Sequence, residues 1–288
     1  MRVVVRAGGP GVSRVSVARL VALADGMAPR DRQIVETVAG LTLVSGGQLV
    51  NLFFNNNGDS SSPFTRARLA RRVLARLVEQ RVLDRLERRR GGAGGGSTAW
   101  VYALGPAGRR MVAYWAGEGL PRSRGAYEPA PAWTAHRLAV SDLYVRLREA
   151  ERAAQIELLA FDGEPAAWRG YSRLGGAAGV LKPDAYLRLG VGEFEDSFFV
   201  EVDLGSERRG QLIRQHRAYS EYFRAGVEQA KTGVFPGVLW VVPDAQRMAL
   251  LADIHRGLPE QTGRLFTVVT SAQALAVLCG EASTRAAA

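Results

Sequence analysis

The sequence predicts a mixed α/β (α+β) protein in two parts, a helical part followed by one in which strands and helices alternate. Apolar residues recur at helical spacing between residues 29 and 79, whereas short strand-like runs follow residue 132. The chain has 288 residues, of which 47% are hydrophobic, so it can build two domains with separate cores. No apolar run is long enough to span a bilayer, and we expect a cytoplasmic protein.

The charge balance predicts an anionic partner. The chain carries 38 basic and 28 acidic residues, a formal net charge of +10. Between residues 62 and 90 lie ten arginines, three acidic residues and no lysine, so most of the excess charge falls in one short segment. Arginine is well suited to binding phosphate and guanine, which makes double-stranded DNA the expected partner.

Three helices are expected before a hairpin in the first part, and one more helix is expected after it, over residues 105–120. Pro29 begins the first helix, and Ser45 with Gln48 forms a capping-box pattern before the second. Ser62 and Pro63 are a typical start for the third, which places apolar residues on one face and arginines on the other.

A basic hairpin follows the third helix. Residues 81–90 and 98–105 have strand character, and the glycine-rich stretch at 91–97 suits the turn between them. Three helices and a hairpin predict a winged helix, with the third helix in the major groove and the hairpin along the backbone. The DNA-binding residues expected from this plan are Arg66, Arg68, Arg71, Arg72, Arg76, Arg85, Arg88, Arg89 and Arg90. The alternative is that these arginines form an ordinary solvated surface.

The chain divides at composition changes. Residues 1–26 alternate arginine and valine without a clear helix stop and are expected to be a loosely attached tail. Residues 27–120 form the winged helix, and residues 121–131, rich in Pro, Arg and Gly, form a linker. Residues 132–288 form the second domain. Its expected helices are 134–154, 209–226, 245–258 and 272–280, and its expected strands are 156–161, 184–191, 197–204, 237–242 and 264–270.

Acidic residues lie on two neighbouring strands of the second domain. Glu201 and Asp203 are two positions apart and therefore project to the same side of a strand, and Asp184 begins the preceding strand. Carboxylates placed together repel one another, and a Mg²⁺ or Mn²⁺ ion would relieve that repulsion and could serve phosphodiester cleavage. The alternative is that these acids are the solvated ends of two ordinary strands.

This arrangement resembles the PD-(D/E)xK restriction-endonuclease-like superfamily. Pro183-Asp184 matches its Pro-Asp pair, Glu201-x-Asp203 occupies its acid-x-Lys positions, and Gln215 with Tyr219 resembles a Q-x-x-x-Y element of some nucleases. The resemblance implies catalytic roles for Asp184, Glu201, Asp203, Gln215 and Tyr219, with the first three as metal ligands. Asp203 replaces the usual lysine, and Lys182 is the preferred substitute.

Both halves together resemble the replication-relaxation family over roughly residues 27–275. The segments that carry the resemblance are RDRQIV, YALGPAGRR, HRLAVSDLYVRL, LKPDAYLRL and FFVEVDLGSE. It implies DNA binding in plasmid or mobile-element replication or transfer, with nicking as an accompanying activity. A second copy of the chain and other replication or transfer proteins are further implied partners.

Three functions remain open from the sequence. They are a metal-dependent nickase, a non-catalytic DNA-binding factor with a degenerate nuclease-like domain, and a partner-binding module whose charge is incidental. His136, His216 and His255 are separate in the sequence and do not form the His-x-His cluster of tyrosine relaxases, but His136, near the start of the helix expected at 134–154, could approach the acidic residues. No phosphate-binding loop of the GxxxxGK[ST] type occurs, so nucleotide hydrolysis is not expected.

Overall fold

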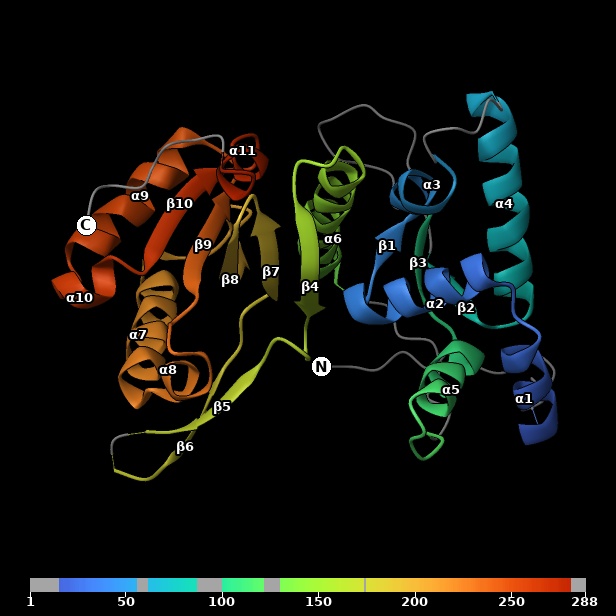
Figure 1. The fold of residues 1–288 in the computed structure, drawn as a ribbon, viewed down its shortest axis with the longest axis horizontal. Helices are drawn as coiled ribbons and strands as arrows, with labels where there is room; N and C mark the ends of the chain where they lie inside the picture. The colour runs from blue at the N-terminus through green and yellow to red at the C-terminus, as the bar shows by residue number, and fades with distance from the viewer. Residues whose placement is uncertain (1–15, 56–61, 87–99, 122–129, 174, 281–288) are drawn as a thin grey trace.

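The computed structural model describes residues 16–55, 62–86, 100–121, 130–173 and 175–280 (Figure 1). The fold is mixed α/β, as the sequence predicts. Among the described residues, no helix has the length and apolar character needed to cross a membrane.

The N-terminal half is built from helices around a small antiparallel sheet. Its strand order is β1-β3-β2, with the central strand paired on both sides. Side chains from every helix of this half share one buried core. The elements are α1 (Val17–Asp25), α2 (Pro29–Leu41), β1 (Val44–Ser45), α3 (Gly46–Phe53), α4 (Pro63–Glu79), β2 (Leu83–Leu86), β3 (Val101–Leu104) and α5 (Pro106–Trp115).

The helix starts in this half follow local sequence signals. Pro29 and Pro63 occupy first positions of α2 and α4, where the missing amide hydrogen costs nothing. Ser62 caps α4 by accepting a hydrogen bond from the amide of Thr65. Ser45 and Gln48 bond each other's backbone amides in a full capping box, so that predicted motif is confirmed.

The prediction of a loose tail over residues 1–26 is wrong for its second part. Ser16 caps α1, and Leu20 on this helix is fully buried in the N-terminal core, next to α5. Leu20 and Ala24 are four positions apart and so lie on one apolar face of the helix, which the alternation of arginine and valine concealed. Residues 1–15 lie outside the described residues.

The C-terminal half contains a five-stranded mixed sheet of order β10-β9-β8-β7-β4. Strands β4, β7 and β8 pair antiparallel, while β8, β9 and β10 run parallel. The helices are α6 (Pro131–Arg152), α7 (Arg209–Ala225), α8 (Val227–Thr232), α9 (Ala245–Arg256), α10 (Glu260–Gly263) and α11 (Ala274–Leu278). The sheet strands are β4 (Glu157–Gly163), β7 (Ala185–Val191), β8 (Phe194–Val202), β9 (Gly237–Val242) and β10 (Phe266–Thr270).

Two apolar layers cover the faces of this sheet. Residues of α6 and α11 pack with Leu187 and Val200 on one face, and residues of α7 and α9 pack with Phe199 and Trp240 on the other. Neighbouring positions in a strand point to opposite faces, which explains why Phe199 and Val200 enter different cores. Strands β7 and β9 consequently read as nearly continuous apolar runs.

A two-stranded ribbon that the sequence did not predict lies between β4 and β7 in the chain. Strands β5 (Arg169–Ser172) and β6 (Ala178–Leu181) pair with each other and project from the sheet (Figure 1). Each has only four residues, and the glycines within them weaken the strand pattern. The short helices α8 and α10 were missed for the same reason of length.

Helix α6 joins the two halves. Ser141 donates to the carbonyl oxygen of Leu43 at 2.6 Å, and Gln48 donates to that of Leu138 at 3.0 Å. Gly163 at the end of β4 comes so close to the carbonyl oxygen of Gly40 that no larger side chain fits there. Of the expected linker, residues 122–129 lie outside the described residues.

Candidate functional site

Helix α4 places its arginines on an exposed face. Its buried positions are Ala70, Val73, Leu74 and Leu77, which contribute to the N-terminal core. The opposite side of the helix carries Arg68, Arg71, Arg72 and Arg76, all exposed. Figure 1 shows α4 at the outer edge of the N-terminal half, away from the large sheet.

The arginines of α4 differ in how far they are engaged. Arg76 pairs with the buried carboxylate of Asp31 on α2, and Arg71 donates to the carbonyl oxygen of Ala67 in its own helix. Among the described residues, Arg68 and Arg72 have no hydrogen-bond or ion-pair partner. These two guanidinium groups are therefore available to a ligand without first breaking a contact in the protein.

The remaining predicted basic residues lie near the start of α4 or on the hairpin. Arg66 is half-buried, and its Nε is enclosed without a hydrogen-bond partner. Arg85 on β2 is exposed and lies over the ring of Trp100, with Cζ 4.0 Å from the ring centroid. Arg88, Arg89 and Arg90 lie outside the described residues.

Asp184 lies just before β7, where it connects α6 to the end of β8. Its Oδ1 accepts a hydrogen bond from Nε2 of His136 at 2.8 Å, and its Oδ2 accepts one from the amide of Val202 at 2.8 Å. The bond to the Asp184 carboxylate raises the pKa of His136, although burial of the imidazole opposes the shift. Both oxygens of Asp184 thus have partners within the chain.

Glu201 is held by α7, on the face of the sheet opposite α6. The hydroxyl of Tyr219 donates to Oε1 of Glu201 at 2.6 Å, and both side chains are buried. Burial raises the pKa of Glu201 well above its ordinary value, and the charge of Asp184 raises it further. Burial, followed by the charge of Glu201, also raises the pKa of Tyr219. Asp184 lies close to Glu201, because it is hydrogen-bonded to the backbone of Val200 and Val202 on either side of it.

Asp203 takes part in a separate set of contacts just beyond β8. It forms a buried ion pair with Arg247 of α9, and its Oδ1 accepts the amide of Gly205 at 2.8 Å. Arg247 also donates to the carbonyl oxygen of Glu207 at 2.8 Å, which fixes the turn after the strand. The contacts of Asp203 thus stabilise the loop between β8 and α7.

These contacts bear on the predicted metal ligands Asp184, Glu201 and Asp203. A magnesium site needs several oxygen atoms that point at one position. Both oxygens of Asp203 accept hydrogen bonds, from Arg247 and from Gly205, so a cation at this residue would compete with these contacts. Across the part of the chain that the structure describes, no three His, Cys, Asp or Glu side chains are arranged to hold a metal ion.

The other predicted catalytic residues lie at one pocket beside Glu201. Lys182, Gln215, Tyr219 and Arg214 line this space of about 280 Å³ between β6 and α7. The Lys182 ammonium group lies over the ring of Trp168, with Nζ 4.4 Å from the ring centroid. Oε1 of Gln215 is enclosed and has no hydrogen-bond partner. Lys182, Glu201, Gln215 and Tyr219, which the family resemblance named as catalytic residues or their substitute, therefore lie around the same pocket.

Sequence reasoning missed two members of this region. Arg247 comes from α9, 44 residues after its partner Asp203. Glu207 follows β8, accepts a hydrogen bond from Gln211, and has a pKa raised by burial and by the charges of Asp203 and Asp184. The sequence placed Glu207 only beside Asp203 at the exit of the strand, as part of the solvated alternative, whereas nothing in the local pattern around Arg247 indicates its role.

Comparison with known proteins gives one match. The model of the replication-relaxation family matches residues 36–238, more than half of the chain. No curated protein and no solved structure matches the chain. The matched span includes helix α4, Asp184, the whole of β8 and helix α7. The chain therefore belongs to the replication-relaxation family, which associates it with the replication of plasmids and other mobile elements.

Proposed function

We propose that this chain binds double-stranded DNA in plasmid or mobile-element replication, through a winged helix within residues 27–120 whose recognition helix is α4. One observation carries the proposal. The outward face of α4 presents Arg68 and Arg72 without partners in the described chain, flanked by Arg71 and Arg76. A helix with this face fits a major groove, where guanidinium groups bind phosphates and guanine.

The small sheet supports the same reading. Strands β2 and β3 form an antiparallel pair directly after α4, and Arg85 extends from β2 at an exposed position. A hairpin in this place would lie along the DNA backbone while α4 enters the groove. Phosphate contacts of this kind position the protein and make binding strongly dependent on salt.

We propose that the C-terminal half serves as a nuclease-like scaffold rather than as a metal-dependent catalytic centre. The support is the internal pairing of its acids, because Asp203 is bound by Arg247 and Glu201 by Tyr219. A cation at either carboxylate would compete with these buried contacts. This is the non-catalytic alternative left open by the sequence.

The test is a DNA-binding measurement on the full chain over a salt series. Each lost phosphate contact lowers the slope of log K against log salt by about 0.9, so Arg68→Gln with Arg72→Gln should reduce it by about 1.8 and weaken binding about tenfold or more. Arg256→Gln with Arg264→Gln is the matched control, because these arginines of the C-terminal half are 73% and 74% exposed and the charge change is equal. Equal effects of the two double variants would reject α4 as the DNA-binding helix.

A second candidate function is metal-dependent nicking, favoured by Lys182 and Glu201, which line the pocket beside α7, and by Asp184, which bonds the amide of Val202 next to Glu201. Supercoiled plasmid incubated with the protein and Mg²⁺ or Mn²⁺ tests it. If this function holds, nicked circles form with the wild type and vanish in Asp184→Asn and Lys182→Gln, while both variants still bind DNA. Absence of nicked product with either ion, from protein that binds DNA, leaves the non-catalytic function.

A further inference from the structure

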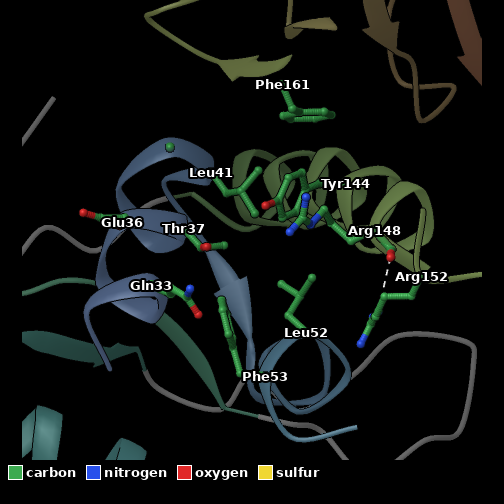
Figure 2. A pocket seen from close by; sticks show the side chains of 11 residues that line it. Gln33, Glu36, Thr37, Leu41, Leu52, Phe53, Tyr144, Arg148, Arg152 and Phe161 are labelled. Carbon is green, nitrogen blue, oxygen red and sulfur yellow. Dashed lines mark hydrogen bonds between the residues drawn. The ribbon is translucent and has the colours of Figure 1, made fainter. Parts of the chain in front are cut away.

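A pocket of about 470 Å³ lies where the two halves of the chain meet (Figure 2). Helices α2 and α3 of the N-terminal half form one side, and α6 with β4 of the C-terminal half forms the other. Its volume falls within the roughly 300–1,000 Å³ typical of small-ligand sites, which often occur between domains.

Helix α6 is hydrogen-bonded to the N-terminal half on both sides of the pocket. Ser141 donates to the carbonyl oxygen of Leu43, and Arg152 donates to that of Asn51 at 2.8 Å. Tyr144 and Arg148 lie between these anchors on the same stripe of the helix. Both side chains line the pocket (Figure 2), and Tyr144 also packs against the edge of the N-terminal core.

Aromatic and apolar surfaces form one part of the lining. Phe53, Tyr144 and Phe161 come from three different elements, and the rings of Tyr144 and Phe161 meet edge to face at a centroid distance of 5.0 Å. All three rings are only half-buried. Rings arranged around a cavity favour a flat ligand, because such a ligand can stack on them.

Polar groups form the other part. The Arg148 guanidinium reaches toward the middle of the group of side chains (Figure 2) and is paired with Glu151 at 2.5 Å. Because the Arg148 side chain is 43% exposed, that pair is screened by water and readily exchanged for another anion. Thr37 and Gln33 add a hydroxyl and an amide, which can bond the edge of a heterocycle. Glu36 also borders the pocket, but its carboxylate accepts from Arg32 at 2.8 Å and points away from the centre.

We propose that this pocket binds a nucleotide, with the base against the aromatic rings and the phosphate at Arg148. An inorganic anion would leave the rings unused, and a purely apolar ligand would bury the polar groups of Thr37 and Gln33 without partners. A base joined to a phosphate satisfies both parts of the lining. The nucleotide is either a free nucleoside monophosphate or one residue of a single-stranded DNA segment.

Such a ligand would touch both halves of the chain at once. Thr37 and Phe53 belong to the N-terminal half, while Tyr144, Arg148 and Phe161 belong to the C-terminal half. Binding energy then favours the joined arrangement over any in which the halves separate. The proposal is independent of DNA binding by α4, because none of the pocket residues lies on that helix.

The experiment is isothermal titration of the full chain with dAMP, inorganic phosphate, deoxyadenosine and a short single-stranded oligonucleotide. We expect saturable binding of dAMP or of the oligonucleotide, and weaker binding of phosphate or nucleoside alone. Loss of the charge-assisted contact in Arg148→Gln should raise the Kd about tenfold, and Thr37→Val should raise it by a smaller factor. Both variants are at the pocket surface, and near-ultraviolet circular dichroism verifies their folding.

Two controls locate the site. Arg264→Gln removes an exposed, ion-paired arginine far along the chain and should leave the Kd unchanged. Arg68→Gln with Arg72→Gln should also leave it unchanged, which separates this pocket from the surface of α4. Binding of dAMP assigns the site to a free nucleotide, and binding of the oligonucleotide alone assigns it to single-stranded DNA. No saturable binding of either, or binding that Arg148→Gln does not weaken, overturns the proposal.

Discussion

The arginines of α4 and the carboxylates around β8 are two charged regions of the described chain, and they are built in opposite ways. Arg68 and Arg72 are exposed and, within the described chain, unpaired. Asp184, Glu201 and Asp203 are buried, and each is bonded to a side chain from another element. The arginines of α4 are available to bind a partner outside the chain. The carboxylates around β8 are already bonded to groups of the chain itself.

The difference follows from the cost of burying charge. An exposed guanidinium stays hydrated and needs no partner, so a helix face can hold several at little cost. A buried carboxylate must be paired, hydrogen-bonded or protonated. Asp203 is paired with Arg247, Asp184 is hydrogen-bonded, and Glu201 has a raised pKa that favours its neutral form. Substitutions in the two regions should therefore affect different properties, binding in the first and stability in the second.

The largest expected effect is on the Asp203–Arg247 pair. In Arg247→Met, Asp203 keeps a side chain that is 1% exposed and loses its charge partner, so the free energy of unfolding should fall by about 3–5 kcal/mol. Urea denaturation monitored by circular dichroism measures it. Arg188→Met is the matched control, because the Arg188–Glu195 pair is exposed and should contribute at most about 1 kcal/mol.

A second variant tests the cause. Adding Asp203→Asn to Arg247→Met removes the unpaired charge and should recover part of the lost stability. Equal stability of Arg247→Met and Arg188→Met would mean that Asp203 reaches water, and the contrast between the two regions would fail at this residue.

A smaller effect is expected from the pH dependence at Glu201. Because its folded-state pKa is raised, chiefly by burial, the folded protein holds this proton more tightly than the unfolded chain. Its contribution to stability is therefore complete below the ordinary carboxyl pKa and is lost as pH rises through the raised value. Glu201→Gln keeps the bond from Tyr219 but cannot ionise, so its stability should change less over that pH range.

Urea denaturation of wild type and Glu201→Gln at several pH values makes the comparison. Glu260→Gln is the control, since the Glu260 side chain is 79% exposed and should leave the pH dependence as it is in the wild type. Parallel stability curves for wild type and Glu201→Gln would show that Glu201 is ionised in the folded protein, which would restore the case for a cation between it and Asp184.

Local signals in the sequence predict the N-terminal half well. The capping residues Ser45 and Ser62 and the first-position prolines Pro29 and Pro63 act through atoms within a few residues, so their effect is readable from the chain alone. The arginine face of α4 is likewise a consequence of helical periodicity. Helix α1 was not predicted, because only two of its nine residues are buried and the apolar periodicity is therefore weak.

The carboxylate region shows where sequence reasoning ends. The positions of its main strands along the chain could be predicted from the apolar pattern. The involvement of Glu201, Tyr219 and Lys182 in one site could be predicted from the family resemblance. The sequence also allowed His136 to approach the acidic residues, which its bond to Asp184 agrees with, whereas the pairing of Asp203 with Arg247, 44 residues away in the chain, could not be predicted. Their approach is decided by how α6 and α9 pack on the sheet, which no local pattern encodes.

The smallest effect is expected at His136, which lies at the edge of the carboxylate region. Its side chain is 29% exposed, and the hydrogen bond to Asp184 raises its pKa against the opposing effect of burial. A raised folded-state pKa means that its contribution to stability is complete below the ordinary histidine value, about 6.5, and is lost as pH rises through the raised value. NMR titration of the imidazole should give His136 a pKa above the ordinary value in the wild type, and Asp184→Asn should lower it.

His255 provides an internal control, because burial and the neighbouring His216 lower its pKa to about 4, and Asp184 is not among the causes. If His136 titrates identically in the wild type and in Asp184→Asn, the two side chains do not face each other. Asp184 would then have an oxygen free for another partner, and the carboxylate region would resemble the α4 surface more closely than the structure indicates.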